Sequence, residues 1–195
     1  MEKTLALERI EQGIPAQKLL EEGIRNLSPD TIEVAIKAGA NINGTIERNG
    51  KSQPLMFYLL GMTGNLFFNV LQGGDRNTPN KIQSIIHMLN ELTRVINRYL
   101  LRSFDSNTIY TANGTQYNII SYIDLMKKRD YYSNYSPPSN IIIEDIREKF
   151  IKFYNDLKKN IQSDIIGGKN KKSRNRKNKR KSRKNKRKSR KIPIF

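Results

Sequence analysis

The sequence predicts an all-α body of stacked helix pairs over residues 1–166, followed by a disordered Lys/Arg-rich tail over residues 167–195. Apolar residues of the body recur at helical spacing, two Asn-Gly pairs separate the helical stretches, and the composition changes abruptly at Gly167-Gly168. No stretch has the apolar alternation typical of a strand. The expected architecture is a short helical solenoid of about two to three irregular repeats, near the lower limit for such folds. A generic helical bundle is the alternative.

The N-terminal part predicts three helices. Residues 3–12 form a short capping helix, and a second helix runs from Pro15 to Arg25. Ser28 followed by Pro29 starts a third, because serine accepts a hydrogen bond from a free N–H of the first turn and proline lacks that N–H. This helix ends near Ala38, where Gly39 provides the left-handed conformation of a helix terminus.

The segment after this helix indicates a turn-rich finger and a new helix. Asn49-Gly50 is a strong signal for a tight turn, and Pro54 suits the first turn of a helix predicted from Pro54 to Leu60. This segment resembles the junction between two ankyrin repeats. The family's Gly-Ala-Asp-x-Asn, finger glycine and Pro-Leu are matched by Gly39, Ala40, Asn43, Gly50, Pro54 and Leu55, with Asn41 in place of the aspartate.

The match to the ankyrin pattern has departures, and the finger is about one residue longer than the family's in two places. Gln53 stands where the family has threonine, and Met56 stands where it has histidine. That threonine and histidine normally tie neighbouring repeats together by hydrogen bonds. The resemblance therefore implies divergent, loosely specified repeats, and it implies protein binding as the role of the body.

The second half repeats the same order of signals. A long apolar stripe from Ile82 to Leu100 predicts a helix that begins at Thr78-Pro79. Asn113-Gly114 then repeats the turn signal of Asn49-Gly50, and it too precedes an apolar helix, from Ile119 to Met126. This internal repeat has a period about twice that of a regular ankyrin array, which implies insertions in helices and loops. Residues 72–77 and 129–139 are predicted loops, and a last amphipathic helix is expected over residues 140–164.

The tail carries most of the net charge of +18. Residues 169–191 hold 16 of the 36 Lys and Arg residues and no acid, which leaves 20 basic against all 18 acidic residues elsewhere. We expect such a segment to be disordered and to bind DNA or RNA through released counterions, without reading sequence. The basic positions nominated for this role are Lys171, Lys172, Arg174, Arg176, Lys177, Lys179, Arg180, Lys181, Arg183, Lys184, Lys186, Arg187, Lys188, Arg190 and Lys191.

Other uses of the tail depend on charge as well. Lys/Arg runs of this kind serve as nuclear or nucleolar import signals. Attraction to anionic lipid is less favoured, because no lipidation motif or long apolar anchor accompanies the charge. Phosphorylation of Ser173, Ser182 or Ser189 would weaken any of these interactions. The tail and the Asn- and Ile-rich body also resemble proteins of large DNA viruses of eukaryotes, which would imply a viral factory or virion.

The residues needed for a reaction are scarce. The chain has no cysteine, and His87 is its single histidine, so a multi-histidine metal site is excluded. Gly73-Gly74 lacks the lysine and Ser/Thr of a phosphate-binding loop. We therefore expect no enzyme, cofactor or metal. The N-terminus lacks the apolar core of a signal peptide, and the apolar window 55–71 predicts a buried helix, so we expect an intracellular, unsecreted protein.

Two functions remain from the sequence. The first is a noncatalytic interaction module, in which the helical body binds a protein and the tail binds nucleic acid or the import machinery. The alternative is a nucleic-acid packaging protein, in which the body only oligomerises or recruits. A concave, exposed apolar or aromatic surface at the finger side favours the first function, and a closed helical bundle with no groove favours the second.

Overall fold

The computed structural model describes residues 2–48, 50–73, 79–131 and 146–163. Within them the chain is mostly helical, as the sequence predicted, and short antiparallel hairpins join the helices. The helices are α1 (Glu2–Glu11), α2 (Ala16–Arg25), α3 (Pro29–Lys37), α4 (Leu55–Gly73), α5 (Pro79–Val95), the π-helical turn η2 (Ile96–Leu100), α6 (Leu101–Ser103), α7 (Ile119–Tyr131) and a final helix over 146–163. The strands are β1 (Thr45–Arg48), β2 (Lys51–Pro54), β3 (Tyr110–Ala112) and β4 (Thr115–Tyr117).

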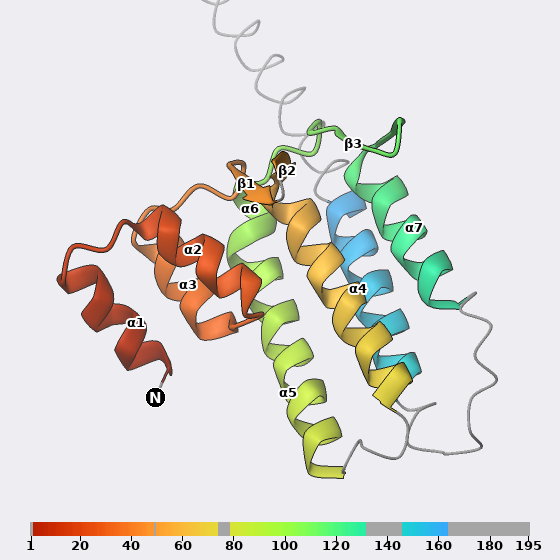
Figure 1. Ribbon diagram of the computed structural model, residues 1–195, viewed down its shortest axis with the longest axis horizontal. Helices are drawn as coiled ribbons and strands as arrows, with labels where there is room; N and C mark the ends of the chain where they lie inside the picture. Colours follow the sequence, from red (N-terminus) through yellow and green to blue (C-terminus); the bar gives the residue numbers. More distant parts are fainter. Residues whose placement is uncertain (1, 49, 74–78, 132–145, 164–195) are drawn as a thin grey trace, which may run out of the picture.

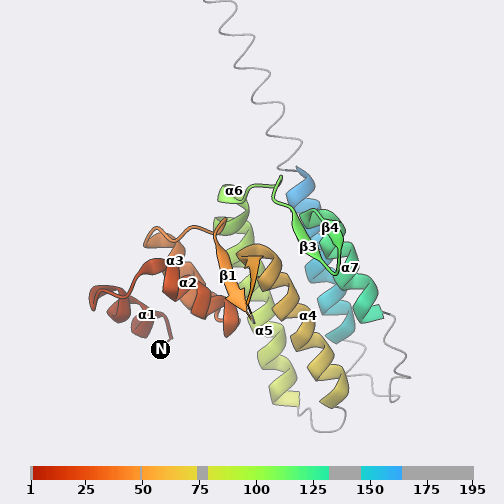
Figure 2. The same cartoon turned by 45° about the horizontal axis from the view of Figure 1, so that its top comes forward.

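The helices lie in two layers (Figures 1 and 2). The front layer is the row α2, α4 and α7, in which α2 packs on α4 and α4 packs on α7. The rear layer contains α3, α5 with η2, and the helix over 146–163. Two contacts place that last helix behind α4: the Tyr154 hydroxyl donates to the Leu60 carbonyl at 3.2 Å, and the rings of Phe67 and Phe150 lie 4.5 Å apart. Helix α1 packs on α3 at the N-terminal end.

The start and end of α3 follow the local sequence. The Ser28 side chain accepts a hydrogen bond from the Thr31 N–H at 3.4 Å, and Pro29 occupies the first turn, which confirms the predicted cap. Gly39 has φ 95°, the left-handed conformation expected beyond a helix C-terminus. Gly23 lets α3 lie close against α2, because a Cβ there would lie 3.0 Å from the Ile32 side chain.

The core is continuous from α1 to the last helix. The beginning of α4 is its centre, since the side chains from Leu55 to Leu60 are all buried. A helix that is apolar on every side is surrounded by other elements. Here α2, α7, β1 and β2 contact it. Among the described residues, no helix has the length and apolar content needed to cross a bilayer.

The two hairpins correct the expectation that the chain holds no strands. β1 pairs with β2 and β3 pairs with β4, and both hairpins lie at the same edge of the helix layers (Figure 1). Each strand is short, and Ile46 alone among their described side chains is fully buried, so the apolar alternation that identifies a strand is absent. The turn signals were correct: Gly50 has φ 70°, and Asn113 and Gly114 have φ 51° and 76°.

Several predicted boundaries also change. Pro54 is the last residue of β2, so the predicted helix begins one residue later, at Leu55, and it continues to Gly73 across the predicted start of a loop. Helix α7 extends to Tyr131, into the predicted loop over 129–139. The long helix predicted from Pro79 to Leu100 is confirmed as α5 and η2, with α6 continuing it to Ser103.

Candidate interaction surface

The connection between α3 and β1 is a compact turn held against α2. The Asn41 side-chain oxygen accepts the Asn43 N–H at 3.0 Å, and the Asn41 carbonyl accepts the Gly44 N–H at 3.2 Å. The Gln17 side chain of α2 accepts the Asn41 N–H at 2.9 Å. Gly44 then fixes the following helix, because its carbonyl accepts the Leu55 N–H at 3.0 Å.

The connection before β3 forms the same turn in the second half of the body. The Asp105 side chain accepts the Asn107 N–H at 2.9 Å, and the Asp105 carbonyl accepts the Thr108 N–H at 3.0 Å. Asp105 therefore occupies the place of Asn41, and Asn107 occupies the place of Asn43. This second turn was not predicted from the sequence, because Asp-x-Asn followed by threonine lacks the glycines that mark the first connection.

The correspondence continues into the helices that follow. Leu55 begins α4 and Ile119 begins α7, and both are buried. Tyr58 and Tyr122 each lie one turn further along their helix, at the same distance from its start, and they are buried too. The offset from Leu55 to Ile119 is the same as that from Asn41 to Asp105 and from Asn49 to Asn113. The turn, the hairpin and the first turns of the next helix therefore recur as one unit.

Asn43 joins the two connections directly. Its side-chain N–H donates to the Ser103 carbonyl at 2.7 Å, and its side-chain oxygen accepts the Asp105 N–H at 2.8 Å. One amide thus satisfies a carbonyl at the end of α6 and an N–H of the second turn. Asn43 is one of the residues that match the ankyrin pattern, and in the structure it makes this contact between the two turns.

The second hairpin is attached to the helices by aromatic rings. The Tyr122 ring lies 5.1 Å from that of Phe57, 5.7 Å from that of Tyr110 and 5.9 Å from that of Tyr117, in edge-to-face arrangements. Gly61 provides the space for this cluster, since a Cβ there would lie 3.2 Å from the Tyr122 hydroxyl. Next to β3 in the chain, the side chain of Ile109 is 51% exposed.

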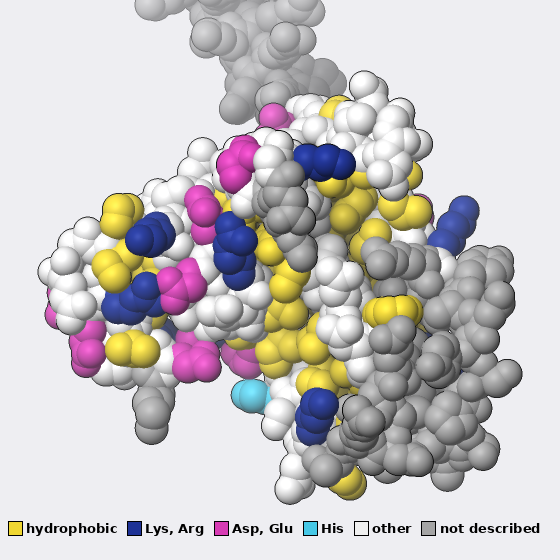
Figure 3. All heavy atoms as spheres, in the orientation of Figure 1, with side chains coloured by type: hydrophobic (Ala, Val, Ile, Leu, Met, Phe, Trp, Pro, Cys, Tyr) yellow, Lys and Arg dark blue, Asp and Glu magenta, His cyan; other side chains and the backbone are white. Residues whose placement is uncertain are grey.

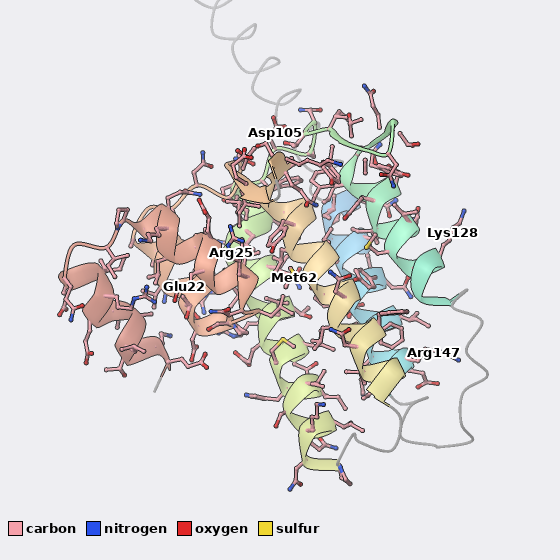
Figure 4. The ribbon with its side chains drawn as sticks, in the orientation of Figure 1. Glu22, Arg25, Met62, Asp105, Lys128 and Arg147 are labelled. Atoms are coloured by element: carbon pink, nitrogen blue, oxygen red, sulfur yellow. The ribbon has the colours of Figure 1, made fainter. Side chains whose placement is uncertain are left out.

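The front layer presents a partly apolar surface beneath the hairpins, which we call the front face and define by Arg25, Glu47, Met62 and Leu66. Figure 3 shows hydrophobic side chains gathered in a band down this side, and Figure 4 places Arg25 and Met62 where α2 meets α4. Arg25 donates to the Glu47 carbonyl at 3.3 Å and lies 5.9 Å from the Tyr58 ring centre. Met62 and Leu66 are only partly buried.

The rear layer contains a buried carboxylate that the sequence analysis did not single out. Glu33 of α3 is 3% exposed in its side chain and accepts hydrogen bonds from Lys37 at 2.6 Å, Arg94 at 2.9 Å and Tyr99 at 3.1 Å, with Lys3 at 3.5 Å. The hydrogen bond from Lys37, reinforced by those from Arg94 and Tyr99, lowers the pKa of Glu33 to about 2. Such a carboxylate is a poor proton acceptor near neutral pH, so its role is to join α1, α3 and α5 with η2. The signal was the Glu33–Lys37 spacing of i to i+4.

The other residues that the sequence indicated for a role lie in different parts of the chain. The residues that match the ankyrin pattern or form the second Asn-Gly turn all lie in or next to the two turn-and-hairpin units. They are Gly39, Ala40, Asn43, Gly50, Pro54, Leu55, Asn113 and Gly114. The basic positions of the tail, from Lys171 to Lys191, lie outside the described residues. His87 is exposed on α5. Among the described residues, no three His, Asp or Glu side chains are grouped as metal ligands would be.

Comparisons of the chain with protein-family models, with curated proteins and with solved structures found no match. The ankyrin resemblance therefore remains a prediction from the sequence motifs.

Proposed function

We propose that this chain is a noncatalytic interaction module, in which ankyrin-like repeats bind a protein and the polybasic tail binds nucleic acid or the import machinery. The observation that carries the proposal is the recurrence, at one constant offset along the chain, of the same turn, hairpin and buried helix start. In a solenoid each repeat contacts its neighbours through equivalent positions. The Asn43 bridge to the second connection supports the proposal, because it joins the two recurring turns directly.

The arrangement of the helices supports the same proposal. The hairpins lie at one edge of the molecule, and the helices form a front row and a rear row. Stacked finger–helix–helix units would produce this arrangement. The units are α2 with α3, α4 with α5 and η2, and α7 with the helix over 146–163, while α1 covers one end. The offset between the units is about twice the period of a regular ankyrin array, and the long helices of the middle unit account for the difference.

The front face has the chemistry of a protein-binding surface. Protein interfaces place apolar and aromatic side chains at the centre and polar groups at the rim, with arginine enriched. Met62 and Leu66 provide apolar area, while Arg25 and Glu47 form a polar edge. A partly buried apolar band with a polar edge favours the interaction module over a body that only supports a packaging tail.

The front-face hypothesis is tested by introducing charge on the apolar band. Met62→Glu with Leu66→Glu in the full chain is expected to abolish capture of a specific protein partner by cross-linking in cells. The matched control, Leu7→Glu with Ile109→Glu, places the same two charges at positions that are 50% and 51% exposed, outside the front face, and should retain the partner. Capture unchanged by both pairs would contradict the hypothesis.

The tail hypothesis is tested by a salt series with duplex DNA and RNA. Replacing Lys179, Arg180, Lys181, Lys186, Arg187 and Lys188 by glutamine in the full chain should reduce the slope of log K against log salt by up to about five. The matched control replaces six asparagine and serine residues of the same segment by glutamine and should leave the slope unchanged. A full chain that fails to bind either nucleic acid near physiological salt would leave import or lipid binding as the role of the tail and would contradict the packaging alternative.

A further inference from the structure

A cleft of about 600 Å³ lies on the N-terminal part of the molecule, between α1, the turn from α2 to α3, and α5. Its apolar lining comes from Leu5 and Ala6 of α1, Leu27 of the turn and Met88 of α5. Leu5 is 58% exposed, and Ala6 is the buried side chain of α1. The apolar area that the cleft presents to solvent therefore comes mainly from Leu5, with a smaller part from the partly buried Met88.

The rim of this cleft is acidic. It is lined by four carboxylates, those of Glu2, Glu22, Asp30 and Glu91. Among the described residues that line the cleft, Arg9 is the one Lys or Arg. Arg9 is occupied by the bidentate pair with Glu22, at 2.7 Å for one of its two contacts. The hydrogen bond from Arg9 lowers the pKa of Glu22, so this carboxyl stays charged at neutral pH.

The remaining rim carboxylates differ in what neutralises them. Glu91 pairs with Arg94 at 2.8 Å. Glu2 accepts a hydrogen bond from the Ser28 hydroxyl at 2.8 Å, and neither Glu2 nor Asp30 has an ion-pair partner among the described residues. Two carboxylates are thus left to bind cations from outside the described body.

The chain itself contains a segment with the complementary chemistry. Residues 169–191 carry 16 basic side chains and no acid, and they are followed at once by the apolar sequence Ile192-Pro193-Ile194-Phe195. A ligand for the cleft needs an apolar group for this apolar area and cations for the rim, and the range 186–195 offers both.

We propose that the cleft binds the C-terminal segment of the same chain, with Ile192–Phe195 against Leu5 and Met88, and with the preceding Lys and Arg residues beside Glu2 and Asp30. Length permits this arrangement. The stretch from 164 to 191 extends to roughly 90 Å at about 3.3 Å per residue. A body of this size has a radius of gyration of about 15 Å. The inference goes beyond the proposed function, because docking occupies basic residues that nucleic acid would otherwise contact.

The absence of cysteine from the chain allows a direct test by disulfide trapping. The first full-length variant is Leu5→Cys with Ser189→Cys, which places one thiol in the cleft and one in the basic segment. The control is Leu7→Cys with Ser189→Cys, because Leu7 is on the same helix and 50% exposed but does not line the cleft. Leu5→Cys and Leu7→Cys are also made as single variants, and the rate at which each thiol reacts with a small disulfide reagent is measured. Each rate of intrachain disulfide formation is divided by the reaction rate of the matching α1 thiol.

Docking is expected to make the cleft disulfide form about tenfold faster than the control, because bound thiols have a higher effective concentration than colliding ones. Replacing Glu2 and Asp30 by Gln and Asn should reduce that ratio severalfold, whereas replacing Glu8 and Glu11, which lie on α1 outside the cleft, should not. Rates equal within about twofold would overturn the proposal. Preferential formation of disulfide-linked dimers would overturn the intrachain arrangement and would place the segment of a second copy in the cleft.

These rates are measured without nucleic acid, so their outcome does not depend on the proposed function. A chain that forms the cleft disulfide rapidly but fails to bind DNA and RNA would support the docking and contradict the nucleic-acid role of the tail. If both hold, duplex DNA added at saturating concentration should slow the cleft disulfide toward the control rate.

Discussion

The two ends of the helix stack are held together by different chemistry. At the N-terminal end, the carboxylate of Glu33 gathers Lys3, Lys37, Arg94 and Tyr99 between α1, α3 and α5 with η2. At the C-terminal end, ring contacts lie in the interior: the Tyr122 cluster attaches the second hairpin, and Phe67 meets Phe150. The ion pair there, Lys158 with Asp124 at 2.7 Å, is more exposed than Glu33. Ion pairs respond to pH, whereas the burial of apolar rings is nearly independent of it. The two ends should therefore fail under different conditions.

The largest effect is expected at the aromatic end, from Phe67→Ala. The Phe67 ring is 1% exposed and packs 4.5 Å from Phe150, so its removal leaves a cavity between α4 and the last helix. We expect a loss of about 3–5 kcal/mol in the free energy of unfolding, measured by urea titration at neutral pH. The neighbouring Phe68 is only partly buried, so Phe68→Ala is the control and should cost clearly less. Equal losses in the two variants would contradict this packing.

The next largest effect is expected at the charged end, from Glu33→Gln. The substitution leaves Arg94 and Lys37 without their shared carboxylate, and we expect it to cost about 2–3 kcal/mol at neutral pH. The cost should depend on pH. Because the pKa of Glu33 is lowered to about 2 in the folded chain, its stabilisation is complete above its unfolded pKa, near 4.5, and is lost as pH falls toward about 2.

The measurement that checks this is urea unfolding at several pH values from neutral down to about 2. The difference in stability between the original chain and Glu33→Gln should shrink steadily between about pH 4.5 and 2 and stay constant above that range. The aromatic variant Phe67→Ala should show a difference that changes little over the same pH range. A constant difference for both variants would show that the Glu33 cluster does not stabilise the folded chain through its charge.

A smaller effect is expected from Asn43, which connects the two units between the ends. Asn43→Ala removes a donor to Ser103 and an acceptor for Asp105, and we expect a loss of about 1–2 kcal/mol. Amide exchange gives the sharper readout. The Asp105 N–H should lose protection in Asn43→Ala but retain it in Asn43→Asp, which keeps a side-chain oxygen and loses only the donor. Equal protection of Asp105 in all three chains would mean that this N–H does not depend on Asn43.

Local signals predicted the parts of the fold that local chemistry decides. Ser28-Pro29, Gly39 and the two Asn-Gly turns each have a conformational reason that operates within a few residues, and each lies where the sequence placed it. The hairpin strands were missed, because such short strands with little burial leave no apolar alternation to detect. The front face, the cleft and the Glu33 cluster depend on contacts across the stack. Glu33 and Arg94, for example, are far apart in the sequence, and no spacing rule connects residues at that separation.

The smallest effect is expected from the exposed ion pair at the charged end, between Arg9 and Glu22. Both side chains remain open to solvent, at 26% and 38% exposure, whereas Glu33 is 3% exposed. Water screens an exposed pair and solvates each partner after the other is removed, so Arg9→Gln should leave the urea midpoint almost unchanged. Glu33→Gln in the same assay serves as the comparison. A loss from Arg9→Gln as large as that from Glu33→Gln would mean that the number of ion pairs, and not their burial, stabilises the charged end.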